Sequence, residues 1–91
     1  MIDGNKVMMF SKEYCPFCTK AKQILKSAGI DFKVYELDKE ADGASMQDKL
    51  KEMSGQRTVP NIYIGGKHLG GCDDLQAGMA NGKVKQMVEA A

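Results

Sequence analysis

Two thiols lie close together in the segment YCPFC at positions 14–18. A cysteine pair at this spacing can form a structural disulfide, supply half of a zinc site or act as a redox centre. A structural zinc ion needs four ligands, and only Cys72 and His68 remain, with no second CxxC. A disulfide across two intervening residues would close too short a loop to constrain the unfolded chain usefully. The pair is therefore interpreted as a redox centre.

The position of each thiol predicts a different role for it. Pro16 suits the first position of a helix, where its missing N–H costs nothing, and this places Cys15 at the N-cap. The free N–H groups and the positive end of the helix dipole favour an anion there, and Lys12 adds a cation. Cys15 is thus predicted to be the attacking thiolate. Cys18 lies one turn further inward and is predicted to be a more buried, resolving thiol.

The elements that must position this pair follow from the hydrophobic pattern. Short runs rich in apolar, β-branched or aromatic residues predict four strands, at 6–10, 31–37, 61–64 and 67–71. Helical spacing of apolar residues predicts helices at 15–28, at about 44–54, and on both sides of Asn81-Gly82 towards the end of the chain.

The order of these elements predicts the topology. A strand–helix–strand start implies a parallel pair with a right-handed crossover. Gly65-Gly66 is a hairpin turn signal, so the last two strands should be antiparallel. We expect one domain, residues 1–91, with an α/β thioredoxin-like fold and a mixed four-stranded sheet flanked by helices.

Composition argues against several classes of protein. Thirteen basic and twelve acidic residues leave a net charge of +1, whereas a nucleic-acid binder would show a basic excess. No apolar run approaches the roughly 20 residues of a membrane span, and the first ten residues lack a secretory signal pattern. Three cysteines are too few for a secreted disulfide framework. We expect a cytoplasmic protein with no nucleic-acid or membrane partner.

Two longer segments, SKEYCPFCTKAK and GQRTVPNIYIGGKHLGGCDDL, together resemble a dithiol glutaredoxin over nearly the whole chain. Thioredoxins usually carry a tryptophan before the cysteine pair, and this chain has none. The resemblance implies a glutathione-dependent thiol–disulfide oxidoreductase that reduces protein–glutathione mixed disulfides and protein disulfides. It further implies a role in electron transport and cell redox homeostasis, glutathione as cosubstrate, no tightly bound cofactor or metal, and a monomer that acts on glutathionylated or disulfide-bonded client proteins.

The resemblance also implies a glutathione groove. Lys12 and Gln56, with Arg57, would address the glycine carboxylate of glutathione, and Phe17 would form one wall. Phe17 stands where tyrosine is commonest in the family. From the residues alone, Lys12 and Arg57 are equally well read as solvated surface charges.

The other groove positions implied by the resemblance lie further along the chain. The backbone of Val59, held by a cis Pro60, would pair with the cysteinyl unit, while Cys72 and Asp73 would bind the γ-glutamyl end. Sequence patterns alone also allow Pro60 simply to start a strand, Cys72 to be a small buried hydrophobe and Asp73 to complement a helix dipole. The complete predicted groove is Lys12, Phe17, Gln56, Arg57, Thr58, Val59, Pro60, Gly71, Cys72 and Asp73.

A rival function belongs to another class of protein. Some relatives in the resembling family form a dimer that holds a [2Fe–2S] cluster with the first cysteine of the pair and two glutathiones, a role that would fall to Cys15. Pro16 counts against this alternative, because cluster-binding relatives tend to have glycine or serine at that position. A specific client, such as ribonucleotide reductase, is not encoded in any sequence pattern.

Overall fold

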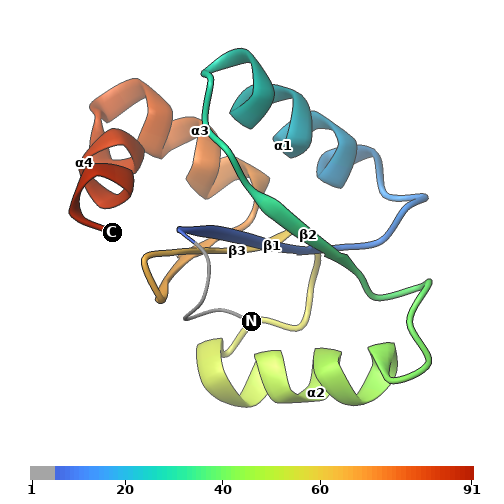
Figure 1. The fold of residues 1–91 in the computed structure, drawn as a ribbon. Coiled ribbons are helices and arrows are strands. Elements are labelled where there is room, and N and C mark those ends of the chain that lie inside the picture. Colours follow the sequence, from blue (N-terminus) through green and yellow to red (C-terminus); the bar gives the residue numbers. More distant parts are fainter. Residues whose placement is uncertain (1–5) are drawn as a thin grey trace.

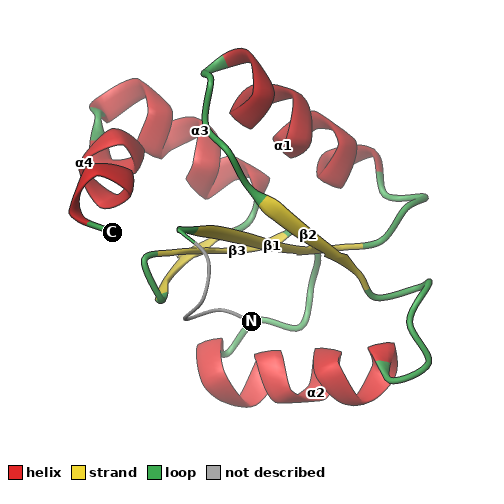
Figure 2. Cartoon of the chain, in the orientation of Figure 1, coloured by secondary structure: helices red, strands yellow, loops and turns green. Residues whose placement is uncertain are grey.

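The computed structural model describes residues 6–91, and helices alternate with strands along most of the chain (Figures 1 and 2). The strands are β1 (Val7–Ser11), β2 (Lys33–Glu36), β3 (Asn61–Ile64) and β4 (Lys67–Gly70). The helices are α1 (Pro16–Ser27), α2 (Gly43–Ser54), α3 (Cys72–Asn81) and α4 (Lys83–Ala90).

The four strands form one mixed sheet in the order β2-β1-β3-β4. β1 pairs with β2 in parallel, with Phe10 opposite Tyr35, and the crossover between them is α1. β3 is antiparallel to both of its neighbours, β1 and β4. The predicted α/β fold with a mixed four-stranded sheet is therefore confirmed.

Helices cover both faces of the sheet, with α1, α3 and α4 on one side and α2 on the other (Figure 1). Because side chains alternate along a strand, β1 supplies both layers of the core. Met9 belongs to the cluster beneath α1, α3 and α4, whereas Met8 and Phe10 pack with Leu50 of α2. The whole of β1 is buried, as predicted for a strand covered on both faces.

The ends of three strands differ from the sequence prediction, and β4 ends one residue earlier than predicted, at Gly70. β1 extends to Ser11, whose buried hydroxyl donates a hydrogen bond to the Glu36 carboxylate. β2 is shorter than predicted because its pairing with β1 begins with Lys33 opposite Met8. The predicted break between the last two helices is confirmed at Gly82, which adopts a left-handed conformation with φ of 82°.

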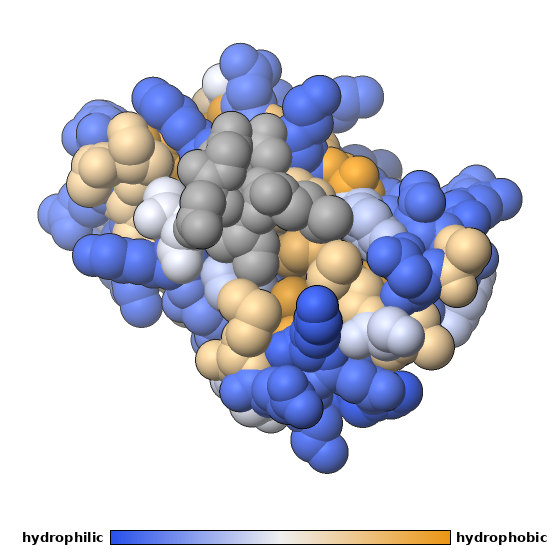
Figure 3. Space-filling model, turned by 60° about the horizontal axis from the view of Figure 1, so that its bottom comes forward, coloured by the Kyte–Doolittle hydropathy of each residue, from blue (hydrophilic) through white to orange (hydrophobic). Residues whose placement is uncertain are grey.

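Hydrophilic side chains dominate the outline of the face that carries α2, and apolar ones gather towards the middle of the view in Figure 3. Three large apolar side chains are exposed among residues 6–91, namely Tyr14, Phe17 and Met53. Tyr14 precedes the cysteine pair and Phe17 lies between its two members, so two exposed aromatic side chains lie next to the thiols in the chain. Within the same residues, no helix combines the length and the apolar character needed to cross a membrane.

Candidate active site

Cys15 is the N-cap of α1, with Pro16 at the start of the helix as predicted. The Cys15 backbone is extended and its N–H donates to the carbonyl of Lys12 at 3.0 Å. The Cys15 sulfur accepts the backbone N–H of Cys18 at 3.3 Å and lies 3.9 Å from the carbonyl oxygen of Val59. Cys15 is partly exposed and is a free thiol. An anionic sulfur at this position would be stabilised by the helix N-terminus.

Cys18 lies on the inner side of α1 and is also a free thiol, with no exposed surface. Burial, together with the hydrogen bond to Cys15 and its charge, raises the pKa of the Cys18 thiol from an ordinary 9.0 to about 12. A backbone hydrogen bond from Lys12 and the charge of Lys22 act in the opposite direction but do not offset burial. The predicted burial of Cys18 is confirmed, and the raised pKa keeps its thiol protonated at neutral pH.

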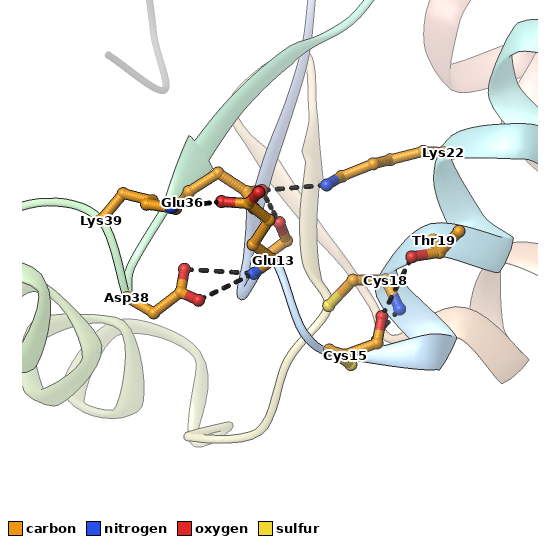
Figure 4. A network of polar contacts seen from close by, with 9 residues as sticks. Glu13, Cys15, Cys18, Thr19, Lys22, Glu36, Asp38 and Lys39 are labelled. Carbon is orange, nitrogen blue, oxygen red and sulfur yellow. Dashed lines mark hydrogen bonds and ion pairs between the residues drawn. The ribbon is translucent and has the colours of Figure 1, made fainter.

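A partly buried polar network joins α1 to the sheet near the cysteines (Figure 4). Lys22 forms an ion pair with Oε1 of Glu36 at 3.0 Å, and the Ser11 hydroxyl donates to the same oxygen. The second oxygen of Glu36 is buried without a hydrogen-bond partner among the described residues. Both charged side chains are largely shielded from solvent, so the pair holds the helix against β1 and β2 at the level of Cys18.

The loop before Cys15 is held by the segment that follows β2 (Figure 4). The backbone N–H of Glu13 donates to both carboxylate oxygens of Asp38 at 3.1 Å. The Glu13 carboxylate forms an exposed ion pair with Lys39 at 3.0 Å, which raises the pKa of Lys39. These contacts fix where the chain enters α1.

A groove of about 330 Å³ opens beside the cysteine pair. All of the predicted groove residues line it except Lys12 and Arg57, and Asp74 lines it as well. Arg57 instead forms an exposed ion pair with Asp48 at 3.3 Å. The groove's lining is Phe17, Gln56, Thr58, Val59, Pro60, Gly71, Cys72, Asp73 and Asp74.

The two sides of the groove come from distant parts of the chain. One side is the loop before β3, where the Val59–Pro60 peptide bond is cis, as the family resemblance implied. The other side is the N-terminus of α3, where Asp74 accepts the N–H of Gly71 at 3.1 Å. Asp74 was not among the predicted residues, although the adjacent acids of the CDD segment are a signal for it. Cys72 is 6% exposed, and burial raises the pKa of its thiol.

Gln56 uses its side chain within the groove wall. Its amide nitrogen donates to the carbonyls of Thr58 and Pro60 at 3.0 and 2.9 Å, and its amide oxygen lies 3.2 Å from Nε2 of His68. His68 is a residue of β4, as predicted, and no sequence pattern pointed to its contact with Gln56. Among residues 6–91, no three His, Cys, Asp or Glu side chains are grouped as a metal site would require.

A thioredoxin-like fold with a CxxC pair at the start of its first helix, facing a cis-proline loop, defines a thiol–disulfide oxidoreductase. The glutaredoxin family model matches residues 7–69. The chain is 48% identical over 91 residues to a glutaredoxin of Vernicia fordii, and the match covers 100% of this chain and 88% of that protein. It is 50% identical over 90 residues to glutaredoxin-1 of Rhizophagus irregularis, and this match covers 99% of this chain and 89% of that protein. The chain belongs to the glutaredoxin family.

Solved structures agree with this assignment. A crystal structure of a buckwheat glutaredoxin–glutathione complex superposes with a TM-score of 0.95 at 40% identity, covering 98% of this chain and 81% of that one. A crystal structure of a wheat glutaredoxin superposes with a TM-score of 0.94 at 47% sequence identity, and the match covers 99% of this chain and 85% of the wheat chain. The chain is a glutathione-dependent thiol–disulfide oxidoreductase, and its dithiol site is Cys15 and Cys18.

Proposed function

We propose that Cys15 alone opens the reaction and that the groove beside it binds the glutathione half of the substrate. The Cys15 thiolate attacks the glutathionyl sulfur of a client mixed disulfide. The new sulfur–sulfur bond forms as the old one breaks, and the client leaves as a thiolate that takes up a proton. A second glutathione then attacks the enzyme–glutathione disulfide, releasing oxidised glutathione and the Cys15 thiolate.

Cys18 enters only when the mixed disulfide must be resolved within the enzyme. Its thiol lies behind Cys15 on the same helix, so after losing its proton it can attack the Cys15 sulfur and release the bound thiol. The observation that carries this division is the contrast between a partly exposed Cys15 at the groove and a Cys18 with no exposed surface.

The groove offers complementary groups for glutathione at both ends. The N-terminus of α3 presents free backbone N–H groups to the γ-glutamyl carboxylate, and the Asp73 carboxylate suits its ammonium. The backbone of Val59 is placed to pair with the cysteinyl unit, and Phe17, 61% exposed, forms an apolar wall. Lys12 and Arg57 lie outside the groove lining, and we assign them a longer-range attraction for the glycine carboxylate. The buckwheat relative was solved as a glutathione complex, which supports the binding of glutathione itself.

We also propose where the protein acts and in which oligomeric state. The protein acts as a monomer in the cytoplasm, carries electrons from glutathione to disulfide-bonded clients, and contributes to redox homeostasis there. It holds no permanent cofactor. A visible-region spectrum of anaerobically purified protein checks the last point: we expect no absorption bands, whereas the bands of an iron–sulfur cluster would support the rival dimeric function.

Two variants on two substrates test the roles of the cysteines. Cys15→Ser is expected to abolish reduction of both a glutathionylated peptide and a protein disulfide, because serine stays protonated at neutral pH. Cys18→Ser should keep most activity on the glutathionylated peptide and lose most activity on a protein disulfide that needs both thiols. If Cys18→Ser is as inactive as Cys15→Ser on the glutathionylated peptide, the proposed mechanism is wrong.

A further inference from the structure

The orientation of the Gln56 amide is determined by what surrounds it. Its nitrogen faces the carbonyls of Thr58 and Pro60, which can only accept hydrogen bonds. The NH₂ group must therefore point at these two carbonyls, and the amide oxygen must point at His68. Rotating the amide by half a turn would set its oxygen against two carbonyl oxygens and lose both bonds. Gln56 thus spans the loop on either side of Val59.

The partner of the Gln56 oxygen is the ring of His68. An amide oxygen only accepts, so Nε2 of His68 must carry a proton and donate across the 3.2 Å contact. The ring is itself placed by packing on Tyr63, its partner across the β3–β4 pair, with the ring centres 5.2 Å apart. His68 is therefore a fixed donor at the outer side of the groove wall.

We propose that His68 is a positioning residue for the glutathione groove: its Nε2–H fixes the Gln56 amide, and that amide fixes the backbone that carries Val59. Val59 lies between the two carbonyls that Gln56 holds, and its own carbonyl lies 3.9 Å from the Cys15 sulfur. The same backbone lines the groove. This role rests on the proposed binding of glutathione in that groove.

Losing the donor has a specific consequence for binding. Without it, the Gln56 oxygen has no partner in the wall, and the amide is free to leave the Thr58 and Pro60 carbonyls. The Val59 backbone then spends less time in the arrangement that receives the cysteinyl unit. The KM for a glutathionylated substrate should rise, whereas the rate of sulfur exchange once bound should change little, because the Cys15 sulfur is held by α1 itself.

Two substitutions separate the donor from the ring. His68→Phe keeps an aromatic ring against Tyr63 and removes the donor, whereas His68→Gln carries an N–H near the position of Nε2. For a glutathionylated peptide, His68→Phe should raise KM about three- to tenfold, the range of one ordinary hydrogen bond, with kcat within about twofold. His68→Gln should return KM to within about twofold of the unaltered protein. An unchanged KM in His68→Phe, or equal defects in both variants, would overturn the proposal.

A double substitution tests whether the effect passes through Gln56. In a Gln56→Ala background, His68→Phe should cause no further rise in KM, since the amide that it orients is gone. A full additional rise would mean that His68 acts by another route and would refute the proposal. In a single turnover of the pre-reduced enzyme, a disulfide client without glutathione should be reduced equally by the unaltered protein and the two His68 variants, and a matching loss on that client would also refute the proposal. The outcome is separate from the cysteine test, which decides the proposed mechanism by loss of activity rather than by KM.

Discussion

The acidity of Cys18 is the property of the site that is most directly open to measurement. With a pKa of about 12 instead of an ordinary 9.0, about one Cys18 in 10⁵ is ionised at pH 7 instead of about one in 10². Folding should therefore suppress the Cys18 thiolate about a thousandfold. Since the thiol also has no exposed surface, its reaction with an alkylating reagent should be slower still.

The assay is alkylation of the reduced protein at a series of pH values, with the modified cysteine identified by peptide mass. Because the pKa of Cys18 lies above the accessible range, its alkylation rate should rise about tenfold for each unit from pH 7 to pH 10, without a plateau. Cys15, which is partly exposed, should be modified first at every pH. The protein unfolded in denaturant is the control, where Cys18 regains ordinary behaviour.

Two results would refute this reasoning. One is a plateau in the Cys18 rate near pH 9 in the folded protein, which would mean that burial does not raise its pKa. The other is alkylation of Cys18 before Cys15, which would reverse the roles given to the two thiols. A Cys18 alkylation rate that is lower in the folded than in the unfolded protein, and that does not level off near pH 9, supports the raised pKa of Cys18.

Three further predictions concern other parts of the molecule. Cys18→Ser incubated with oxidised glutathione should carry one glutathione on Cys15 and none on the buried Cys72, as intact-protein and peptide masses would show; labelling of Cys72 would contradict its burial. Lys22→Met leaves the partly shielded Glu36 carboxylate without its cation. The free energy of unfolding, measured with urea, should fall by about 1–3 kcal/mol. An unchanged unfolding midpoint would mean that the ion pair does not stabilise the fold. Gly43→Ala would set a Cβ 1.8 Å from the Leu37 carbonyl oxygen and should destabilise the protein by more than about 2 kcal/mol in the same assay, whereas Ala44→Gly should cost about 1 kcal/mol.

Local patterns were enough to predict the arrangement of the elements. The apolar run of β1, the Gly65-Gly66 turn and the break at Gly82 each reflect short-range physics, and the structure has all three. Strand ends were less predictable because they depend on the partner. β2 begins only at Lys33, opposite Met8, although β1 begins one residue earlier at Val7, and no property of residues 31–32 announces this.

The site shows the same division between local and long-range information. The N-cap position of Cys15 and the burial of Cys18 follow from proline and helix geometry within one turn. The contact between Gln56 and His68 could not be predicted, because it depends on the path of the loop between α2 and β3, which brings Gln56 to β4. Counting outward from the Gly65-Gly66 turn does place His68 opposite Tyr63, but Gln56 lies outside both strands.

The three-residue spacing of the cysteines couples their chemistry as well as their positions. It puts one sulfur at the open end of α1 and the other on the buried side, where burial first, and then a hydrogen bond and a charge from the first sulfur, raise the pKa of the second. Once Cys15 is joined to glutathione it carries no negative charge, so both of these influences weaken, while the charge of Lys22 still lowers the pKa of Cys18. We therefore expect the pKa of the resolving thiol to lose the part that Cys15 contributes when there is a disulfide to attack, while burial, the largest cause, continues to raise it.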